Sequence, residues 1–275
     1  MKNILYFLLF LSNFIFVELS FSKSDYKIVS LAPNLTEIVY ALGLGDNLVG
    51  NTFLCDYPEE ANKIEKIGNF NAPNIEKILA LKANIVLATE GNPKDKLNTL
   101  NSLGIKVIYF KADSIYDLAA EIIKLGSYLE KKEKANLISE SILKSYNNLK
   151  SSKNNLSFLF ALQFNPVYSF SDNTWLGDLF KQAGFKNIVA RSLIKYPKIT
   201  NEFLLNHDPN IILAGTLDGK TYQESVNFQK INIEKIFGEK ARSIKLIIVP
   251  KDILVRPGPR IVEGIKFLES LKIEK

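Results

Sequence analysis

Two residues near the carboxyl end of the chain have the chemistry to bind a polar ligand. Asp252 and Arg256 lie four positions apart, directly after the apolar run at residues 246–250, which is typical of a buried strand. An arginine fork binds amide or carboxylate oxygens, and a nearby aspartate orients the fork or accepts hydrogen bonds from amides. Ligands of parallel α/β sheets lie at the carboxyl ends of strands. A local salt bridge that braces the loop is the alternative interpretation of the pair.

No constellation of reactive residues accompanies this pair. His207 is the only histidine, and its place at a predicted helix end favours a carbonyl cap over a metal ligand. Cys55 is the only cysteine, which excludes an internal disulfide and a cysteine cluster for zinc. The chain also lacks a phosphate-binding glycine loop and a Gly-x-Ser-x-Gly elbow. We therefore expect no catalytic residue, no metal and no cofactor; a chelatase-like enzyme is a distant alternative.

The chain alternates short β-branched runs with helical patterns, as parallel sheets with crossover helices do. In the first half we predict strands at 28–32, 48–52, 85–88 and 106–110, and helices at 35–42, 75–81, 93–103 and 115–129. In the second half we predict strands at 157–163, 187–190, 211–215 and 246–250, and helices at 175–183, 201–206, within 222–237 and at 260–271. Asn34 with Glu37 resembles a capping box at the first helix.

Both halves contain the same helix-to-strand unit. Residues 75–88 align without gaps over residues 201–214, so that Glu76 matches Glu202 at an offset of 126 positions (202 minus 76). Any helix that leads into a parallel strand has a similar apolar pattern, which explains the apolar part of the match. The matching glutamate at the start of each helix is harder to attribute to chance, and it predicts two similar lobes.

One long helix, predicted at residues 129–150, has no counterpart in the repeat. Its apolar residues fall at steps of three and four, which indicates one buried stripe: Ala135, Ile138, Ile142, Tyr146 and Leu149. We therefore predict an α/β fold of two Rossmann-like lobes with parallel sheets, joined by one long α-helix. The boundaries are 23–128 for the N-terminal lobe, 129–152 for the linking helix and 153–275 for the C-terminal lobe.

Residues 1–22 have the form of a cleavable secretory signal peptide. Lys2 precedes an apolar run at residues 4–17, and Ser20 and Ser22 supply small residues for cleavage. The run is short for a membrane span, although an uncleaved anchor is the alternative. No lipid-attachment cysteine follows, and the net charge of +6 is scattered rather than gathered into a nucleic-acid patch. We expect a periplasmic protein that does not bind nucleic acid.

Five segments of the chain resemble the helix-hinged substrate-binding proteins of ABC transporters, and most closely their periplasmic cobalamin-binding branch. The segments are residues 28–37, 55–58, 74–82, 103–107 and 256–260. The resemblance implies two lobes that face each other across a ligand cleft, a helical link that permits only small closure, and delivery of ligand to the permease subunits of an ABC importer. It also implies that Glu76 and Glu202 dock against basic residues of the permease, where separated charges fix orientation. The alternative is that each glutamate only favours its helix dipole.

In the cobalamin-binding relatives, aromatic side chains and a few polar groups line the cleft, which suits a large flat ligand. The resemblance implies ligand contacts for five residues here: Tyr57, Phe70, Tyr196, Asp252 and Arg256. Tyr168 is a sixth predicted contact, because the loop after the first strand of the second lobe is expected to face the cleft. Where the relatives have a tryptophan and an arginine, this chain has Thr89-Glu90-Gly91 and so a carboxylate. We expect a corrinoid, cobalamin-like ligand; the alternative is a ferric siderophore, haem or another metal chelate.

Overall fold

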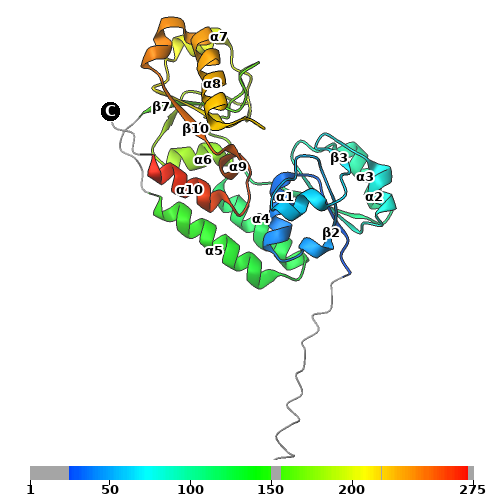
Figure 1. The fold of residues 1–275 in the computed structure, drawn as a ribbon. Coiled ribbons are helices and arrows are strands. Elements are labelled where there is room, and N and C mark those ends of the chain that lie inside the picture. Colours follow the sequence, from blue (N-terminus) through cyan, green and yellow to red (C-terminus); the bar gives the residue numbers. More distant parts are fainter. Residues whose placement is uncertain (1–24, 150–155, 218, 272–275) are drawn as a thin grey trace, which may run out of the picture.

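A computed structural model describes residues 25–149, 156–217 and 219–271, which form two α/β lobes connected by a layer of helices (Figure 1). The predicted signal peptide lies outside the described residues. None of the described helices has both the length and the apolar character needed to cross a membrane.

The N-terminal lobe contains a four-stranded parallel sheet. Its strands are β1 (Ile28–Ser30), β2 (Leu48–Asn51), β5 (Ile85–Thr89) and β6 (Lys106–Phe110), and a small hairpin adds β3 (Gly68–Asn69) and β4 (Ala72–Pro73). Its helices are α1 (Pro33–Ala41), α2 (Ile75–Ala80) and α3 (Lys94–Ser102). Short 3₁₀ turns occupy residues 45–47 and 59–63.

The C-terminal lobe repeats this plan. Its sheet contains β7 (Ser157–Ala161), β8 (Lys186–Asn187), β9 (Ile211–Gly215) and β10 (Lys245–Val249). Its helices are α6 (Trp175–Gln182), α7 (Asn201–Asn206), α8 (Tyr222–Phe237), α9 (Lys251–Val255) and α10 (Ile261–Ser270), with a 3₁₀ turn at residues 238–243. The short helix α9 was not predicted from the sequence, and it carries Asp252.

The strand orders of the two sheets are equivalent. They are β2-β1-β5-β6 in the N-terminal lobe and, written from the other edge, β8-β7-β9-β10 in the C-terminal lobe. The helix-to-strand unit found in the sequence is therefore α2–β5 in one lobe and α7–β9 in the other, and the 126-residue offset carries Ile85 onto Ile211, where these two strands begin. The fold of two similar parallel-sheet lobes is confirmed.

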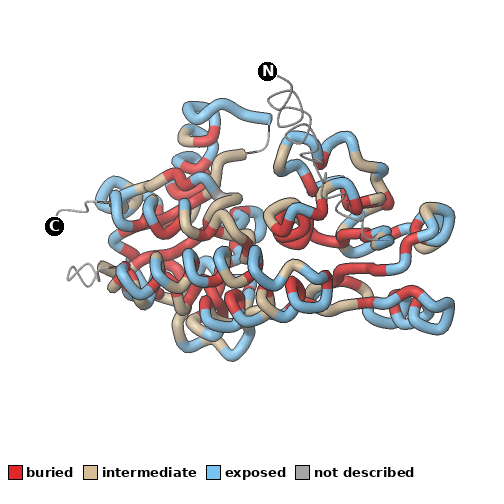
Figure 2. The backbone as a smooth tube through the Cα atoms, turned by 90° about the horizontal axis from the view of Figure 1, so that it is seen from below, coloured by how far each residue is buried: buried red, intermediate tan, exposed pale blue. Residues whose placement is uncertain are grey.

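The strand side chains alternate between two cores, because successive residues of a strand point to opposite faces of a sheet. Leu87 in β5 and Leu213 in β9 face one core that runs through both lobes and the helices that connect them. Val86 and Ile212 face separate outer cores, one per lobe. Figure 2 shows buried segments in both lobes and along the inner sides of the connecting helices. The lobes are thus joined by apolar packing as well as by the chain.

The connection between the lobes is an antiparallel helix pair. The predicted long helix begins later than expected, because Leu129 is the C-cap of α4 (Ile115–Tyr128) and a turn with Glu130 at φ 57° precedes α5 (Lys132–Asn148). The helix α5 therefore starts three positions after the predicted start at residue 129, and residues 150–155 lie outside the described part. A Cβ at Gly126 would overlap Ala135, so glycine permits the close approach of the two helices.

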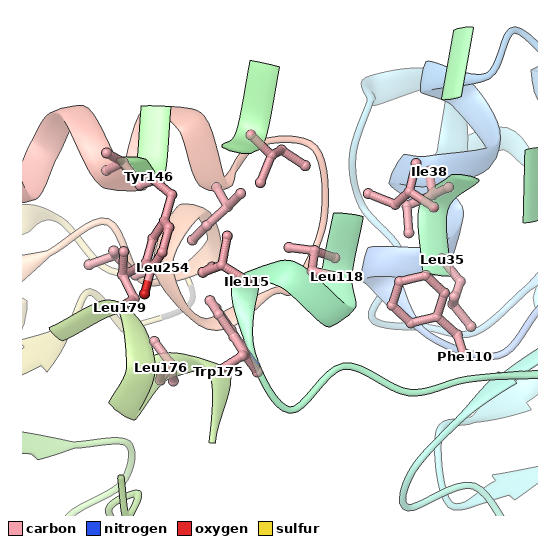
Figure 3. Packing of buried hydrophobic residues seen from close by; sticks show 14 of the residues in the cluster. Leu35, Ile38, Phe110, Ile115, Leu118, Tyr146, Trp175, Leu176, Leu179 and Leu254 are labelled. Carbon is pink, nitrogen blue, oxygen red and sulfur yellow. The ribbon is translucent and has the colours of Figure 1, made fainter. Parts of the chain in front are cut away.

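Both connecting helices reach the C-terminal lobe at one carboxylate. Asp178 of α6 accepts a hydrogen bond from the Ile115 backbone amide at 3.1 Å and another from the Tyr146 hydroxyl at 3.0 Å. Burial is the main reason that the pKa of Tyr146 is raised, and its contact with Asp178 adds to the effect. In Figure 3, Ile115 and Leu118 lie between the group around Leu254 and the group around Leu35. The first turns of α4 therefore pack between the lobes.

Candidate ligand site between the two lobes

A buried carboxylate of the N-terminal lobe binds two arginines of the C-terminal lobe. The Glu37 carboxylate accepts hydrogen bonds from Arg260 at 2.6 and 2.9 Å and from Arg256 at 3.2 Å. The side chain of Glu37 is 2% exposed, and those of Arg256 and Arg260 are 13% and 15% exposed. A buried charge needs such partners, because desolvation without them is costly. These ion pairs hold α1 against the start of α10.

The predicted capping box at α1 is wrong. The helix begins at Pro33 after Ala32, and no side chain caps it. The side-chain amide of Asn34 instead donates to the Pro257 carbonyl oxygen at 3.3 Å, across the lobes. Contacts with the other lobe therefore replace the local partners that the sequence pattern suggested for Asn34 and Glu37.

Arg256 also binds two aspartates. Its Nη1 lies 2.7 Å from Asp56 of the N-terminal lobe, and its Nη2 lies 3.3 Å from Asp252 four positions earlier. The local salt bridge considered from the sequence is therefore present, beside a shorter bridge to the other lobe. Burial would raise the pKa of Asp56, but the hydrogen bond and charge of Arg256 outweigh it, so that this pKa is lowered.

The ring of Tyr57 packs against one arginine of this ion network. The guanidinium carbon of Arg260 lies 3.9 Å from the ring centroid, a cation–π geometry. Tyr57 remains 44% exposed, so its outer face is open to a ligand. Phe53 and Leu54, in the same loop after β2, are 60% and 58% exposed.

A second ion bridge joins the lobes at the opposite sheet edge. The Lys195 ammonium lies 2.6 Å from Asp113 and 3.0 Å from Glu90, both in loops of the N-terminal lobe. Lys111 lies 3.1 Å from the second oxygen of Asp113. Hydrogen bonding to Asp113 is the main cause that raises the pKa of Lys195. Burial alone would raise the pKa of Asp113, but the two lysines lower it.

The two ion bridges mark the ends of one interlobe region. Asp56 follows β2 and Asp113 follows β6, which are the two edges of the N-terminal sheet. Arg256 and Lys195 follow β10 and β8, which are the two edges of the C-terminal sheet. Three strand intervals separate the edges of each sheet, which corresponds to about 14 Å. The loops at the carboxyl ends of the inner strands lie between the bridges, where ligands of parallel sheets bind.

The remaining predicted aromatic contacts are distributed around this region. Phe70 is partly buried, and its ring lies against Gly91, next to Glu90. Tyr168, in the loop after β7, is 37% exposed. Tyr196 adjoins Lys195 and is 45% exposed. Each of these three rings therefore follows or adjoins a loop that contributes to the interlobe region.

Several charged residues of the site were not predicted as site residues, among them Glu37, Asp56, Asp113, Lys195 and Arg260. Asp113 had a usable signal, because it follows the end of a predicted strand by three residues. Asp56 lay inside one of the segments that carried the family resemblance. Lys195 had no signal, since its loop contains neither a helix nor a named strand.

The two predicted docking residues lie on equivalent helices. Glu76 is in the first turn of α2, which Asn74 caps, and Glu202 is in the first turn of α7, which Thr200 caps. Both glutamates are exposed, and neither makes an ion pair within the described residues. Their carboxylates are therefore available to a partner, as the docking hypothesis requires.

The interlobe ion bridges predict an acid-sensitive component of stability. The pKa values of Asp56 and Asp113 lie below the ordinary 3.8, so their contribution is complete above that value. It is lost as the pH falls through the lowered values in the folded protein, because protonation removes the charge that binds the cation. We expect Asp56→Asn with Asp113→Asn to flatten the fall of the unfolding midpoint in this range, measured by thermal unfolding in a pH series.

Asp208→Asn is the control for this experiment, since Asp208 pairs with Lys240 inside the C-terminal lobe. It should leave the fall of the unfolding midpoint at low pH as in the parent protein. If this fall is also unchanged in the Asp56→Asn, Asp113→Asn double variant, the two bridges do not couple stability to pH.

No group of three or more histidine, cysteine or acidic side chains that could hold a metal ion occurs in the described part of the chain. Two similar parallel-sheet lobes, a helical connection and facing polar loops define the class as two-lobed ligand-binding proteins. A model of the periplasmic binding protein family matches residues 28–235, and the chain belongs to this family.

Several proteins similar to this chain are named vitamin B12-binding proteins. A vitamin B12-binding protein of Photorhabdus laumondii subsp. laumondii is 32% identical over 93% of this chain and 90% of its own length. One from Yersinia pestis is 34% identical over 70% of each chain. These relatives are named as binding proteins, and the family is described as one of periplasmic binding proteins.

Solved structures have the same fold. The periplasmic vitamin B12-binding protein BtuF of Vibrio cholerae superposes with a TM-score of 0.72 and 27% identity, over 88% of this chain and 94% of that one. The periplasmic haem-binding protein RhuT of Roseiflexus has a TM-score of 0.75 and 22% identity, over 89% and 96%. The second likeness is one of fold alone.

Proposed function

We propose that this protein captures a corrinoid between its two lobes in the periplasm and delivers it to the permease subunits of an ABC importer. The support that carries the proposal is its similarity to vitamin B12-binding proteins along nearly the whole chain. The same proposal includes export directed by the signal peptide at residues 1–22, which is then cleaved. We infer no catalytic step, cofactor or nucleic-acid partner.

The polar chemistry of the interlobe region favours a ligand without free carboxylates. The cations that reach across it, Arg256, Arg260 and Lys195, are all engaged by acidic side chains. An anionic chelate would have to compete with these acids for the same cations, and the acids would repel it. A corrinoid instead offers neutral primary carboxamides around a large apolar ring. Exposed aromatic rings such as Tyr57 and Tyr196 suit the faces of such a ring.

A haem or ferric siderophore remains the alternative ligand, because haem-binding proteins share the fold. The same six ligand contacts are proposed for a corrinoid and for a haem or ferric siderophore: Tyr57, Phe70, Tyr168, Tyr196, Asp252 and Arg256. The pairing of Arg256 with Glu37 and Asp56 favours the corrinoid version, since that arginine is not free to neutralise a propionate.

Titration of the mature protein with cyanocobalamin tests the ligand. Trp175, the only tryptophan, lies buried in the core at the start of α6. An absorbing corrinoid bound between the lobes should quench the Trp and Tyr emission saturably, with a dissociation constant of about 1 μM or tighter. Haem and ferric siderophores should quench only weakly. Saturable binding of either of them, with no response to corrinoids, contradicts the proposal.

A further inference from the structure

The Lys195 salt bridge contains one unused hydrogen-bond donor and one unused hydrogen-bond acceptor. Lys195 donates one ammonium proton to Oε2 of Glu90 and one to Oδ1 of Asp113, and no further bond from this nitrogen occurs among the described residues. A lysine ammonium has three protons, so one remains. Glu90 uses only Oε2, so its Oε1 remains as an acceptor. A donor and an acceptor thus lie side by side.

The charges of this cluster balance. Glu90 and Asp113 supply two carboxylates, while Lys195 and Lys111 supply two ammonium groups. A ligand anion gains little net attraction here, because every cation has a carboxylate beside it. A neutral group with one donor and one acceptor could bond to both free positions without breaking either ion pair.

The cluster is accessible and lies next to aromatic surface. The side chain of Glu90 is 61% exposed and that of Lys195 is 28% exposed. Phe70 lies against Gly91, which follows Glu90, and Tyr196 follows Lys195. A ligand whose apolar body contacts these rings would place its polar rim at the cluster.

We propose that Glu90, Lys195 and Asp113 form a carboxamide-recognition subsite, which selects ligands with neutral primary amides over ligands with carboxylates. The amide oxygen accepts the free proton of Lys195, and the amide NH₂ donates to the free oxygen of Glu90. Asp113 is a positioning residue that holds Lys195 in place. A ligand carboxylate can satisfy Lys195, but it meets Glu90 as a like charge. This inference rests on the proposed function, because it specifies the class of group that the same site reads.

The matched probes are cyanocobalamin and its monocarboxylic acid derivatives, in each of which hydrolysis has turned one primary amide into a carboxylate. We expect at least one derivative to bind the parent protein about tenfold more weakly than cyanocobalamin. In that derivative, repulsion between the ligand carboxylate and Glu90 replaces a hydrogen bond from the ligand amide to Glu90. In Glu90→Gln the penalty for that derivative should shrink to about twofold, because glutamine donates to the carboxylate. Competition titrations against cyanocobalamin provide the ratios.

Glu133→Gln is the matched control, since Glu133 is an exposed acid on α5 without an ion pair among the described residues. It should keep the selectivity of the parent protein, and thermal unfolding should show both variants to be folded. Equal binding of all derivatives and cyanocobalamin to the parent protein overturns the subsite alone. An unchanged selectivity ratio in Glu90→Gln overturns it as well. Absence of all corrinoid binding overturns the proposed function and the subsite together.

Discussion

Replacing Glu37 by glutamine is expected to lower the free energy of unfolding by about 3–5 kcal/mol, because it removes one partner of a buried ion network. The carboxylate is 2% exposed and binds Arg256 and Arg260 of the other lobe. Glutamine retains the volume but leaves the guanidinium of Arg260 without its carboxylate in a mostly buried place. Arg256 keeps Asp56 and Asp252, so the loss is expected to fall mainly on Arg260.

Chemical unfolding of the variant, followed by circular dichroism, measures this loss. Glu133→Gln, an exposed substitution on α5, should change the free energy by less than about 0.5 kcal/mol. In a double-mutant cycle, Arg260→Gln added to Glu37→Gln should cost much less than it does alone, because the two side chains act as a pair. A loss below about 1 kcal/mol in Glu37→Gln, or strict additivity, would show that the network contributes little to folding.

Glu76→Ala combined with Glu202→Ala is expected to reduce ligand uptake through the importer by about tenfold or more, while the ligand dissociation constant stays within about twofold. Both carboxylates are exposed on equivalent helices and lack partners in the described structure. Loss of two separated charges would slow encounter with a basic surface and remove its orientation. Ligand binding should be retained, since neither residue belongs to the interlobe ion bridges.

Uptake into vesicles that contain the importer, measured beside a ligand titration, separates these effects. Glu133→Ala with Glu140→Ala removes two exposed charges from α5 and should leave uptake unchanged. Charge reversal of Glu76 and Glu202 to lysine should impair uptake further. Impaired ligand binding in the alanine variant would mean that these residues were assigned to the wrong surface. Normal uptake would leave only the local role of each glutamate at its helix terminus.

Local patterns predicted the elements well where an element depends on its own residues. The stripe of α5 is buried at Ala135, Ile142 and Tyr146, as its spacing required. Ser114 caps α4 by accepting a hydrogen bond from the Asp117 amide, which is a contact between near neighbours in the sequence. The helix α5 starts later than the apolar pattern predicts, because Leu129 packs into the same core as the helix stripe although it lies before the helix. Apolar periodicity continued through a turn that only the positive φ of Glu130 reveals.

Local patterns failed where partners from the other lobe were stronger. Asn34 and Glu37 have the spacing of a capping box, but Pro257 and Arg260 satisfy them instead. Asp252 and Arg256 have helical spacing and do pair, yet Arg256 lies closer to Asp56. A pattern of neighbouring residues cannot register such competition, because the competing groups are remote in sequence.

The sequence alone determined the two-lobed parallel-sheet fold, the 126-residue repeat that relates α2–β5 to α7–β9, and the family resemblance. These features follow from short-range periodicity and from the order of segments. Only the tertiary structure decided which acid meets which base across the lobes. Glu90 and Asp113 lie 105 and 82 positions from Lys195, and Glu37 lies 219 positions from Arg256. Ion pairs depend on distance in space, and it is the facing of the two sheets that brings these charges within hydrogen-bonding distance.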